Sequence, residues 1–178
     1  MMTLPAQLDA YHIRGLALCQ LTPAHKGQMV ALQEQVMALL PDPAWYFPSE
    51  DWEFDQWLQN GEAIGYLDGD TLCGYAVMTP QSVRGDHSYA RVLGEAEENT
   101  FDFHDVMVSP DYRRRGLHAN FLKLFTEMAR AMGGKAIYAT VDPENGASWR
   151  NFEREGYRCV TTRPAYDGRL RRYYKKEL

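Results

Sequence analysis

The second half of the chain alternates strand and helix patterns in an order that few folds accommodate. Runs of apolar residues alternate with stretches in which apolar residues recur at helical spacing. The predicted order is strand, helix, strand, helix, strand and strand, over residues 101–108, 117–132, 135–141, 145–155, 157–164 and 170–176. Strands joined by a crossover helix lie parallel in one sheet, so we expect an α/β or α+β sheet with at least one parallel pair.

The first half adds two helices and a hairpin to this sheet. Asp-Gly between two apolar runs is typical of a tight hairpin turn, because this dipeptide tolerates positive φ angles. The elements expected here are a strand at 11–21, a helix begun by Thr22-Pro23 and ended by Pro41, a short helix capped by Ser49 and ended by Gly61, and a hairpin of 63–67 with 72–79. Residues 81–100 are polar and lack periodicity, which predicts a long loop with fraying strand ends.

Length and composition indicate a folded domain. The 178 residues predict a single domain over 1–178, and 45% hydrophobic with 24% charged residues is close to the globular average. No apolar run is long enough for a membrane span, and residues 1–15 carry no leader pattern, so we expect a cytoplasmic protein without a membrane partner. Cys19, Cys73 and Cys159 have neither disulfide nor zinc-site spacing, and no metal is predicted.

Charge is distributed unevenly along the chain. The net charge of -5 disfavours a nucleic-acid partner, so any anion site must be local. Residues 27–83 contain no Lys or Arg but many acidic residues, whereas residues 158–176 are predominantly basic. Two solvated faces explain this pattern as well as a ligand does. If a ligand is involved, the acidic half should attract cations.

The most informative segment is Val108-Ser-Pro-Asp-Tyr-Arg-Arg-Arg-Gly-Leu-His-Ala119. It predicts a strand end, a basic turn and the start of an amphipathic helix. Free N–H groups at a helix N-terminus bind anions, and Gly116 allows a ligand to approach the main chain. Arginine side chains pair well with phosphate oxygens. The segment therefore suits a pyrophosphate, although a solvated basic turn is the alternative.

A second motif follows, Asn145-x-x-Ser148-x-x-x-Phe152-x-x-x-Gly156-Tyr157, whose first members share one helical stripe. Taken singly, these residues are an ordinary cap, a core residue and a helix stop. Together and in this order, the two motifs resemble the GNAT superfamily of acyl-CoA N-acyltransferases. The resemblance is close over 101–158 and holds only in pattern upstream.

The resemblance implies an α+β fold: a mixed, mostly antiparallel central sheet of about seven strands with one splayed parallel pair, flanked by about four helices. It also implies acetyl-CoA as co-substrate, with its pantetheine arm bound by main-chain groups in the gap between the splayed strands, and a main-chain N–H near Val108 that polarises the thioester carbonyl. The residues that it implies for this co-substrate are Val106, Met107, Val108, Arg113, Arg114, Arg115, Gly116, Leu117, His118, Ala119, Asn145, Ser148 and Phe152.

Two positions depart from the family pattern. His118 stands where the family usually has Gly or Ala, which puts the packing around the phosphates in doubt. Phe152 stands where many members have a Tyr that protonates the leaving thiolate. Phenylalanine has no proton to donate, so either one of Tyr166, Tyr173 and Tyr174 serves instead or the thiolate leaves without dedicated help.

Acetyl transfer to an amine also needs a group that removes the amine proton. His104 and Asp105, on the strand that leads into the first motif, are the candidate bases, with Asp105 favoured. Successive strand residues face opposite sides, so only one should face the groove, and a bulge would decide which. A surface histidine and a capping or paired aspartate are the structural alternatives.

The stretch between the first two helices, residues 41–54, is the expected acceptor region. Its aromatic rings can hold a cation and its carboxylates can attract one, which suggests a small cationic amine as acceptor. The candidate residues are Trp45, Tyr46, Glu50, Asp51 and Trp52. A peptide N-acetyltransferase, a non-catalytic acyl-CoA sensor and, less well supported, a nucleotide-binding module are the other functions, and a monomer or homodimer is expected. An alternative interpretation is that the aromatic residues only pack the two helices against the sheet.

Overall fold

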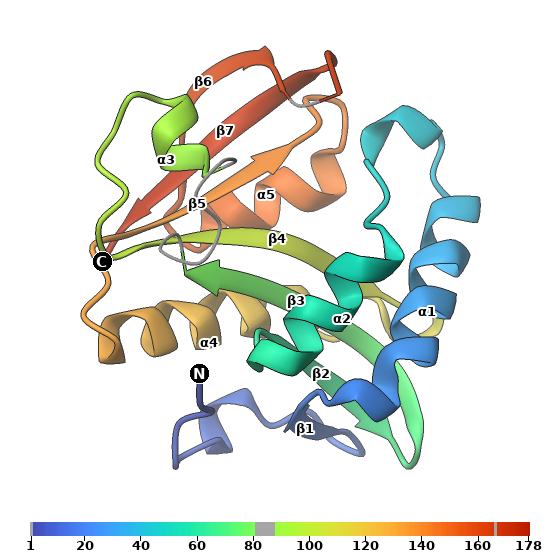
Figure 1. Ribbon diagram of the computed structural model, residues 1–178. Coiled ribbons are helices and arrows are strands. Elements are labelled where there is room, and N and C mark those ends of the chain that lie inside the picture. The colour runs from blue at the N-terminus through green and yellow to red at the C-terminus, as the bar shows by residue number, and fades with distance from the viewer. Residues whose placement is uncertain (1, 81–87, 166) are drawn as a thin grey trace.

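The structure is a computed structural model that describes residues 2–80, 88–165 and 167–178, and it contains one seven-stranded sheet in the order β1-β2-β3-β4-β5-β7-β6 (Figure 1). The strands are β1 (Ala17–Gln20), β2 (Ala63–Asp68), β3 (Thr71–Pro80), β4 (Thr100–Val108), β5 (Ala136–Val141), β6 (Arg158–Pro164) and β7 (Leu170–Glu177). β4 and β5 pair in parallel and the other neighbours pair antiparallel. The α+β prediction with one parallel pair is confirmed.

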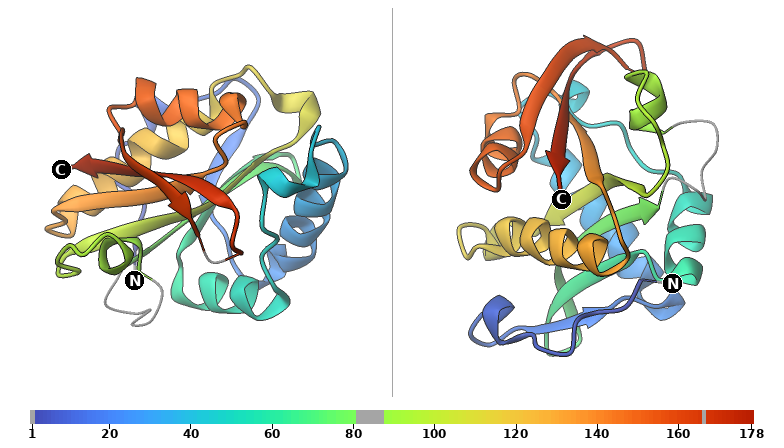
Figure 2. Two further views of the ribbon diagram at one scale, coloured as in Figure 1. Left: turned by 90° about the horizontal axis from the view of Figure 1, so that it is seen from above. Right: turned by 90° about the vertical axis from the view of Figure 1, so that its left-hand side faces the viewer.

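Helices cover both faces of the sheet. They are α1 (Lys26–Ala38), α2 (Asp51–Asn60), the short α3 (Tyr89–Val92), α4 (Leu117–Ala131) and α5 (Gly146–Arg154). Figure 2 shows α4 and α5 on one face and α1 and α2 on the other. Within the described residues, no helix is both long and apolar enough to span a bilayer.

Each face of the sheet has its own apolar core. Phe121 and Phe125 of α4 pack with Phe103 on one face. Met29 of α1 and Trp57 of α2 pack with residues of β3 and β4 on the other. The strands of the middle of the sheet are therefore buried on both sides, and both helical layers are fixed against them.

The parallel pair β4/β5 separates part-way along its length. Its register runs from Thr100 opposite Ala136 to Phe103 opposite Ala139 and stops there, although β4 continues to Val108 and β5 to Val141. Beyond Phe103, β4 still pairs with β3, and beyond Ala139, β5 still pairs with β7. The facing edges of the two strands thus diverge without a strand partner in the described part of the chain.

Several expected boundaries shift. The first strand begins at Ala17 rather than residue 11, because Asp9–Tyr11 forms a single 3-10 turn. Ser49 is not the cap of α2, because Glu50 takes that position and exchanges side-chain to backbone hydrogen bonds with Glu53. Gly61 ends α2 in the left-handed conformation, as predicted.

The loop expected over 81–100 is the least accurate part. Residues 81–87 of this prediction lie outside the described residues. The remainder contains α3, whose N-cap Ser88 accepts a hydrogen bond from the backbone N–H of Arg91. β4 begins at Thr100, one residue before the expected start.

Candidate active site

A cavity of about 1170 Å³ lies where β4 and β5 separate, and it is lined from both helical layers. Its wall combines the turn before α4, the start of α5, the second half of β4 and the segment between α1 and α2. The predicted site residues that line it are Trp45, Tyr46, Glu50, Trp52, His104, Asp105, Val106, Met107, Val108, Arg113, Arg114, Gly116, Leu117, His118, Ala119, Asn145, Ser148 and Phe152. Of the predicted set, Asp51 and Arg115 do not line it.

The turn before α4 has the conformation that an anion site needs. Gly116 is the N-cap of α4 with φ of 88°, and a Cβ at this position would meet no atom within 4 Å. Arg114 also has a positive φ, 61°. The first residues of α4 line the cavity, so the N–H groups that a helix N-terminus leaves unpaired lie beside it. Arg115 instead places its guanidinium 4.8 Å from the ring centre of Tyr112.

The start of α5 forms the neighbouring wall. The Asn145 side chain caps this helix by accepting a hydrogen bond from the backbone N–H of Ser148, at 3.2 Å. Phe152, one turn further on, is 2% exposed and packs edge-on against Phe103 with ring centres 5.3 Å apart. Capping and packing are therefore real roles of these residues, and the same residues face the cavity.

A β-bulge decides which way the candidate bases face. Val77 of β3 is opposite Asp105 and Met78 is opposite Phe103, so His104 is the extra residue on β4. The expectation that only one of His104 and Asp105 faces the groove is wrong, because both line the cavity. His104 Nε2 lies 2.7 Å from the hydroxyl of Thr79, beside Trp57 of α2.

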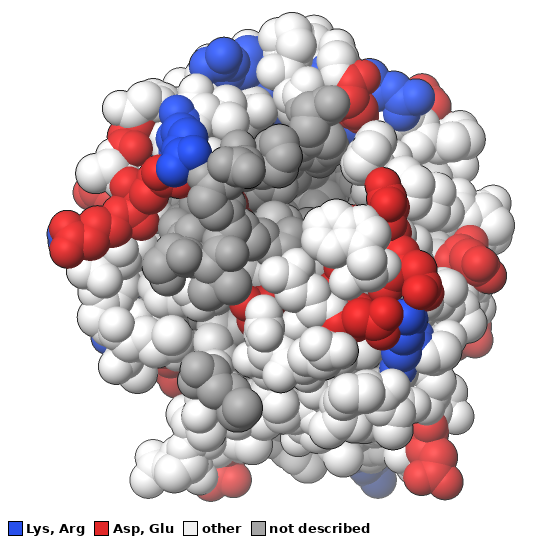
Figure 3. All heavy atoms as spheres, viewed as in Figure 1, with Lys and Arg blue, Asp and Glu red and all other residues white. Residues whose placement is uncertain are grey.

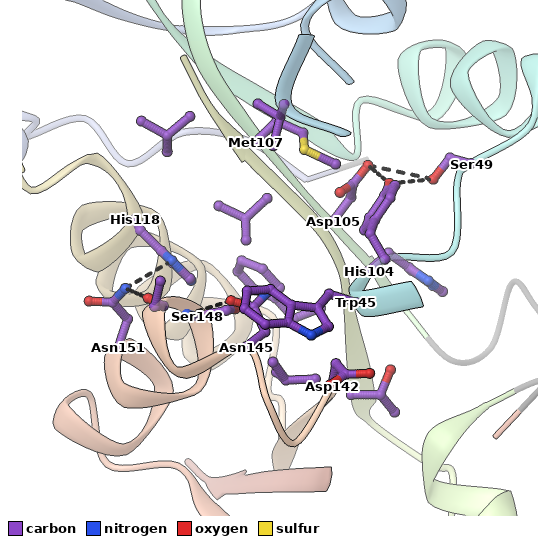
Figure 4. Close-up of a pocket in the computed structure, with 18 of the residues that line it drawn as sticks. Trp45, Ser49, His104, Asp105, Met107, His118, Asp142, Asn145, Ser148 and Asn151 are labelled. Atoms are coloured by element: carbon purple, nitrogen blue, oxygen red, sulfur yellow. Dashed lines mark hydrogen bonds between the residues drawn. The ribbon is translucent and has the colours of Figure 1, made fainter. Parts of the chain in front are cut away.

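Asp105 is a buried carboxylate, 2% exposed, with one oxygen engaged and one free (Figure 4). Oδ2 accepts hydrogen bonds from the hydroxyls of Tyr46 at 2.9 Å and Tyr75 at 3.1 Å, with the Ser49 hydroxyl at 3.5 Å. Oδ1 is buried and makes no hydrogen bond within the described residues. Burial raises the pKa of Asp105 to about 6, against the opposing effect of hydrogen bonds from Tyr46, Tyr75 and the Val106 backbone.

The segment between α1 and α2 is held over the cavity by two side chains from distant parts of the chain. Gln33 of α1 bonds both backbone groups of Ser49, accepting from its N–H at 3.0 Å and donating to its carbonyl at 3.2 Å. Arg171 of β7, 2% exposed, donates to the Ala44 carbonyl at 3.2 Å. The same guanidinium pairs with Asp142 at 3.0 Å and Asp167 at 2.7 Å. These tethers fix the aromatic residues of the segment against β4.

Charge differs between the two ends of the cavity. The end at α4 carries Arg113 and Arg114, and the end at α2 carries Glu50 and Glu53. Asp51 faces away, because it pairs with Lys26 at 2.8 Å. Figure 3 shows acidic side chains gathered over α2, whereas basic ones on this face lie mainly toward β6 and β7.

Two of the three tyrosines considered as proton donors, Tyr173 and Tyr174, do not line the cavity. Tyr173 and Tyr174 are buried and absent from its wall. The Tyr174 hydroxyl donates to Glu153 at 2.9 Å, and burial raises the pKa of Tyr174 to about 12. Tyr166 lies outside the described residues. Neither described tyrosine can reach a ligand in the cavity from this position.

Comparison with known proteins decides the family. The model of the acetyltransferase (GNAT) family matches residues 33–157. The chain is a member of the GNAT acetyltransferase family. The GNAT protein is thus an acetyl-CoA-dependent N-acetyltransferase, and the resemblance seen in its two motifs is confirmed. No curated protein sequence matches it.

Solved structures share the fold of this GNAT protein at low sequence identity. A putative acetyltransferase of Salmonella typhimurium, solved with its cofactor acetyl-CoA, is 16% identical with a TM-score of 0.69, covering 93% of this chain and 95% of that one. The ribosomal-protein-S18-alanine N-acetyltransferase of Escherichia coli is also 16% identical, with a TM-score of 0.65 and coverage of 91% and 93%. These likenesses concern the fold.

The cavity of this GNAT protein has the features that acetyl-CoA requires. The diverging edges of β4 and β5 leave main-chain groups for an amide-containing arm, and the open N-terminus of α4 suits a diphosphate. Two residues of its wall also carry a buried polar atom without a hydrogen-bond partner among the described residues, Asp105 at Oδ1 and His118 at Nε2. Buried polar groups are normally paired, so these atoms indicate a polar ligand.

The sequence prediction missed several residues of this site, five of which hold other site residues in place. Tyr75 and Gln33 hold Asp105 and the acceptor segment, Arg171 and Asp142 form the buried ion pair behind it, and Asn151 contacts His118. Only Asn151 has a local signal in the sequence, because it lies one helical turn after Ser148 on α5 and so shares the side of the helix that faces the cavity. The others come together only through the fold.

Proposed function

We propose that this N-acetyltransferase transfers the acetyl group directly to the primary amine of a small cationic acceptor, with Asp105 as the general base. The observation that carries the proposal is the buried carboxylate of Asp105, which lines the cavity together with Glu50 and Glu53 and whose Oδ1 has no hydrogen-bond partner among the described side chains. Acetyl-CoA supplies the activated acyl group. The residues implied by the motifs hold it, with the turn 113–119 at the diphosphate, β4 main chain at the arm, and Asn145 and Phe152 near the thiol end.

The proton chemistry follows from the surroundings of Asp105. A bound ammonium must lose a proton before nitrogen can attack a carbonyl carbon. A carboxylate with a pKa near 6 is ionised at neutral pH and is a stronger base than an exposed aspartate. Oδ1 takes this proton while Tyr46 and Tyr75 hold Oδ2 in place. His104, whose imidazole lies beside the Thr79 hydroxyl, is the alternative base.

Main-chain N–H groups supply the remaining stabilisation. The edge of β4 beyond Phe103 has no strand partner in the described chain, and it leads to Val108 at the turn. An N–H near Val108 polarises the thioester carbonyl, which develops negative charge as the amine attacks. The opposite edge of β4 pairs with β3, so the orientation of this N–H group is fixed before the acceptor binds.

The cationic acceptor is supported by the composition of the acceptor end. Glu50 and Glu53 line it together with the aromatic rings of Trp45, Tyr46 and Trp52. Carboxylates attract an ammonium group, and aromatic faces stabilise it once it is partly desolvated. The tethered segment, held by Gln33 and Arg171, favours a small molecule over an open peptide groove.

A peptide acceptor is the second candidate. Trp52 is 56% exposed and Phe47 is 47% exposed, and both line the mouth of the cavity. Such apolar residues would also contact side chains of a peptide. A peptide and a small amine differ in length, so substrate length separates the two functions.

The test is a thiol-release screen of acetyl-CoA against polyamines, aralkylamines, amino acids and peptides at one pH. The proposal expects small cationic amines to have the highest kcat/KM. Faster acetylation of acidic or neutral amines would contradict the cationic acceptor, and faster acetylation of peptides would support the second candidate. Binding of coenzyme A without thiol release from any acceptor would indicate an acyl-CoA sensor.

A further inference from the structure

The side chain of His118 has a ring nitrogen, Nε2, that makes no hydrogen bond with any protein group in the described structure. Its ring lies on the cavity wall in the first turn of α4. Nε2 is buried and has no partner among the described residues. The mapping of the family motif uses the main chain here, so the side chain is left without an assigned role.

The neighbouring Asn151 determines which ring nitrogen of His118 carries the proton. The Asn151 amide nitrogen, Nδ2, donates to the Ala147 carbonyl at 2.8 Å, which orients the amide. The same Nδ2 lies 3.2 Å from Nδ1 of His118 (Figure 4). An amide nitrogen only donates, so Nδ1 accepts and the hydrogen of the neutral ring is on Nε2. Burial lowers the pKa of His118 to about 4, so the ring is neutral at physiological pH.

The His118 side chain extends from the turn proposed for the diphosphate toward the point where β4 and β5 stop pairing. The His118 ring stacks near Phe103, the last β4 residue paired with β5, at 6.4 Å between ring centres. It also meets Phe152 edge-on at 5.4 Å. Phe152 stands at the position where many family members carry the tyrosine that serves the leaving thiolate. Phe152 has no hydrogen-bond donor, but the neighbouring His118 side chain has one.

We propose that the Nε2–H of His118 hydrogen-bonds the sulfur of the coenzyme and stabilises the thiolate as it leaves. This inference rests on the proposed function. As the C–N bond forms and the C–S bond breaks, the bonding pair leaves on sulfur, and the amine proton goes to Asp105. His118 keeps its own proton, because a neutral imidazole is too weak an acid to protonate a thiolate. Solvent provides the proton of the released thiol.

The first test measures the thiol in the binary complex, without turnover. The ultraviolet absorbance of bound coenzyme A is titrated with pH for the wild type and for His118→Ala, a residue that the family accepts here. A donor to sulfur lowers the pKa of the bound thiol, so we expect this pKa to rise by about one unit in His118→Ala. An unchanged thiol pKa would overturn the proposal.

The second test is rescue. We expect His118→Ala to lower kcat about 10- to 100-fold, the range for a hydrogen bond to a charged group, with a much smaller change in the Kd of coenzyme A. Phe152→Tyr should restore much of this kcat in the His118→Ala background and add little in the wild type. If kcat falls and Phe152→Tyr does not restore it, His118 serves only in packing. If the Kd of coenzyme A rises while kcat is unchanged, His118 only helps to bind the pantetheine arm. Either result would contradict the proposal.

These results separate the two proposals. If no amine is acetylated by the wild type, the proposed acceptor chemistry fails, yet the thiol titration still tests His118. If amines are acetylated and the thiol pKa does not respond to His118→Ala, only the role of His118 fails. Thermal unfolding of each variant, compared with the wild type, identifies any loss that comes from misfolding.

Discussion

The two ends of the cavity are built in different ways. The end at α4 is made from consecutive residues, 113–119, and acts through backbone conformation and free N–H groups. The end at α2 is made from side chains that come from separate elements, with Asp105 on β4, Tyr75 on β3 and Tyr46 between α1 and α2. Local sequence therefore specifies the end at α4, where we propose that the coenzyme binds (the coenzyme end), whereas tertiary packing specifies the end at α2, where we propose that the acceptor binds (the acceptor end).

The largest effect should come from the acceptor end. Asp105→Asn removes the base but keeps the shape, and we expect kcat to fall at least about 100-fold with little change in the Kd of coenzyme A. In the wild type, Asp105 is protonated below its pKa of about 6 and cannot accept the amine proton, so kcat/KM should rise as pH increases through about 6.

The pH profile is the decisive measurement for that variant. Asp105→Asn should lose the rise near pH 6 as well as most of its rate. If the variant retains both the wild-type rate and the wild-type profile, His104 or water is the base, and the buried carboxylate of the acceptor end is only structural.

At the coenzyme end, a single added Cβ should weaken binding, because it strains the backbone of the turn and takes space that the ligand would occupy. Gly116→Ala puts a Cβ where φ is 88° but where no atom lies within 4 Å, so the cost is about 1–2 kcal/mol of conformational energy. We expect the Kd of coenzyme A to rise about 10-fold, measured by calorimetry.

Gly133→Ala is the matched control for this change. Gly133 has φ of 73°, equally open space and a place at the other end of α4. Both variants should lose similar thermal stability, but only Gly116→Ala should lose affinity. Equal affinity in the two variants would show that the turn before α4 does not hold the coenzyme.

A smaller effect should follow from the hydrogen bond between Tyr46 and Asp105. This bond lowers the pKa of Asp105, so Tyr46→Phe should move the midpoint of the pH profile upward. We expect kcat at pH 6 to fall about threefold to tenfold, because a pKa that is higher by about one unit leaves a smaller fraction of Asp105 ionised at this pH. Tyr75→Phe, which removes the other hydroxyl from the same oxygen, should shift the midpoint in the same direction. A downward shift in either variant contradicts the network.

The smallest effect concerns the charge around the acceptor. Glu50 lines the cavity and Asp51 does not, although they are adjacent in sequence. Glu50→Gln should raise the KM of a cationic amine about twofold to fivefold, whereas Asp51→Asn should leave it nearly unchanged. Equal KM values for the two variants would remove Glu50 from the acceptor site.

The local structure at the end near α4 can be predicted from the sequence because it depends on residues that are close together in the chain. Capping, glycine conformation and helical spacing act over a few residues, so the motif from Val108 to Ala119 and the cap at Asn145 can be read directly. The parallel pair is equally predictable, because a strand, helix and strand in succession require a crossover.

The acceptor end is less predictable because its determinants are distant in sequence. The bulge at His104 depends on register between β3 and β4, and it changes which residues face the cavity. Arg171 contacts Ala44 across 127 positions of sequence, and no local pattern indicates that pairing. Asp51 is predicted to be at the site because its neighbours in sequence are there, but it forms an ion pair with Lys26 and does not line the cavity.

The central claim is that coenzyme A occupies the gap between β4 and β5 with its diphosphate on the turn before α4. A calorimetric titration of the wild type with coenzyme A tests it most directly, with Gly116→Ala titrated alongside. The account predicts one binding site per chain in the wild type and a weaker one in the variant. No detectable binding by the wild type, or the same affinity in both proteins, would contradict it.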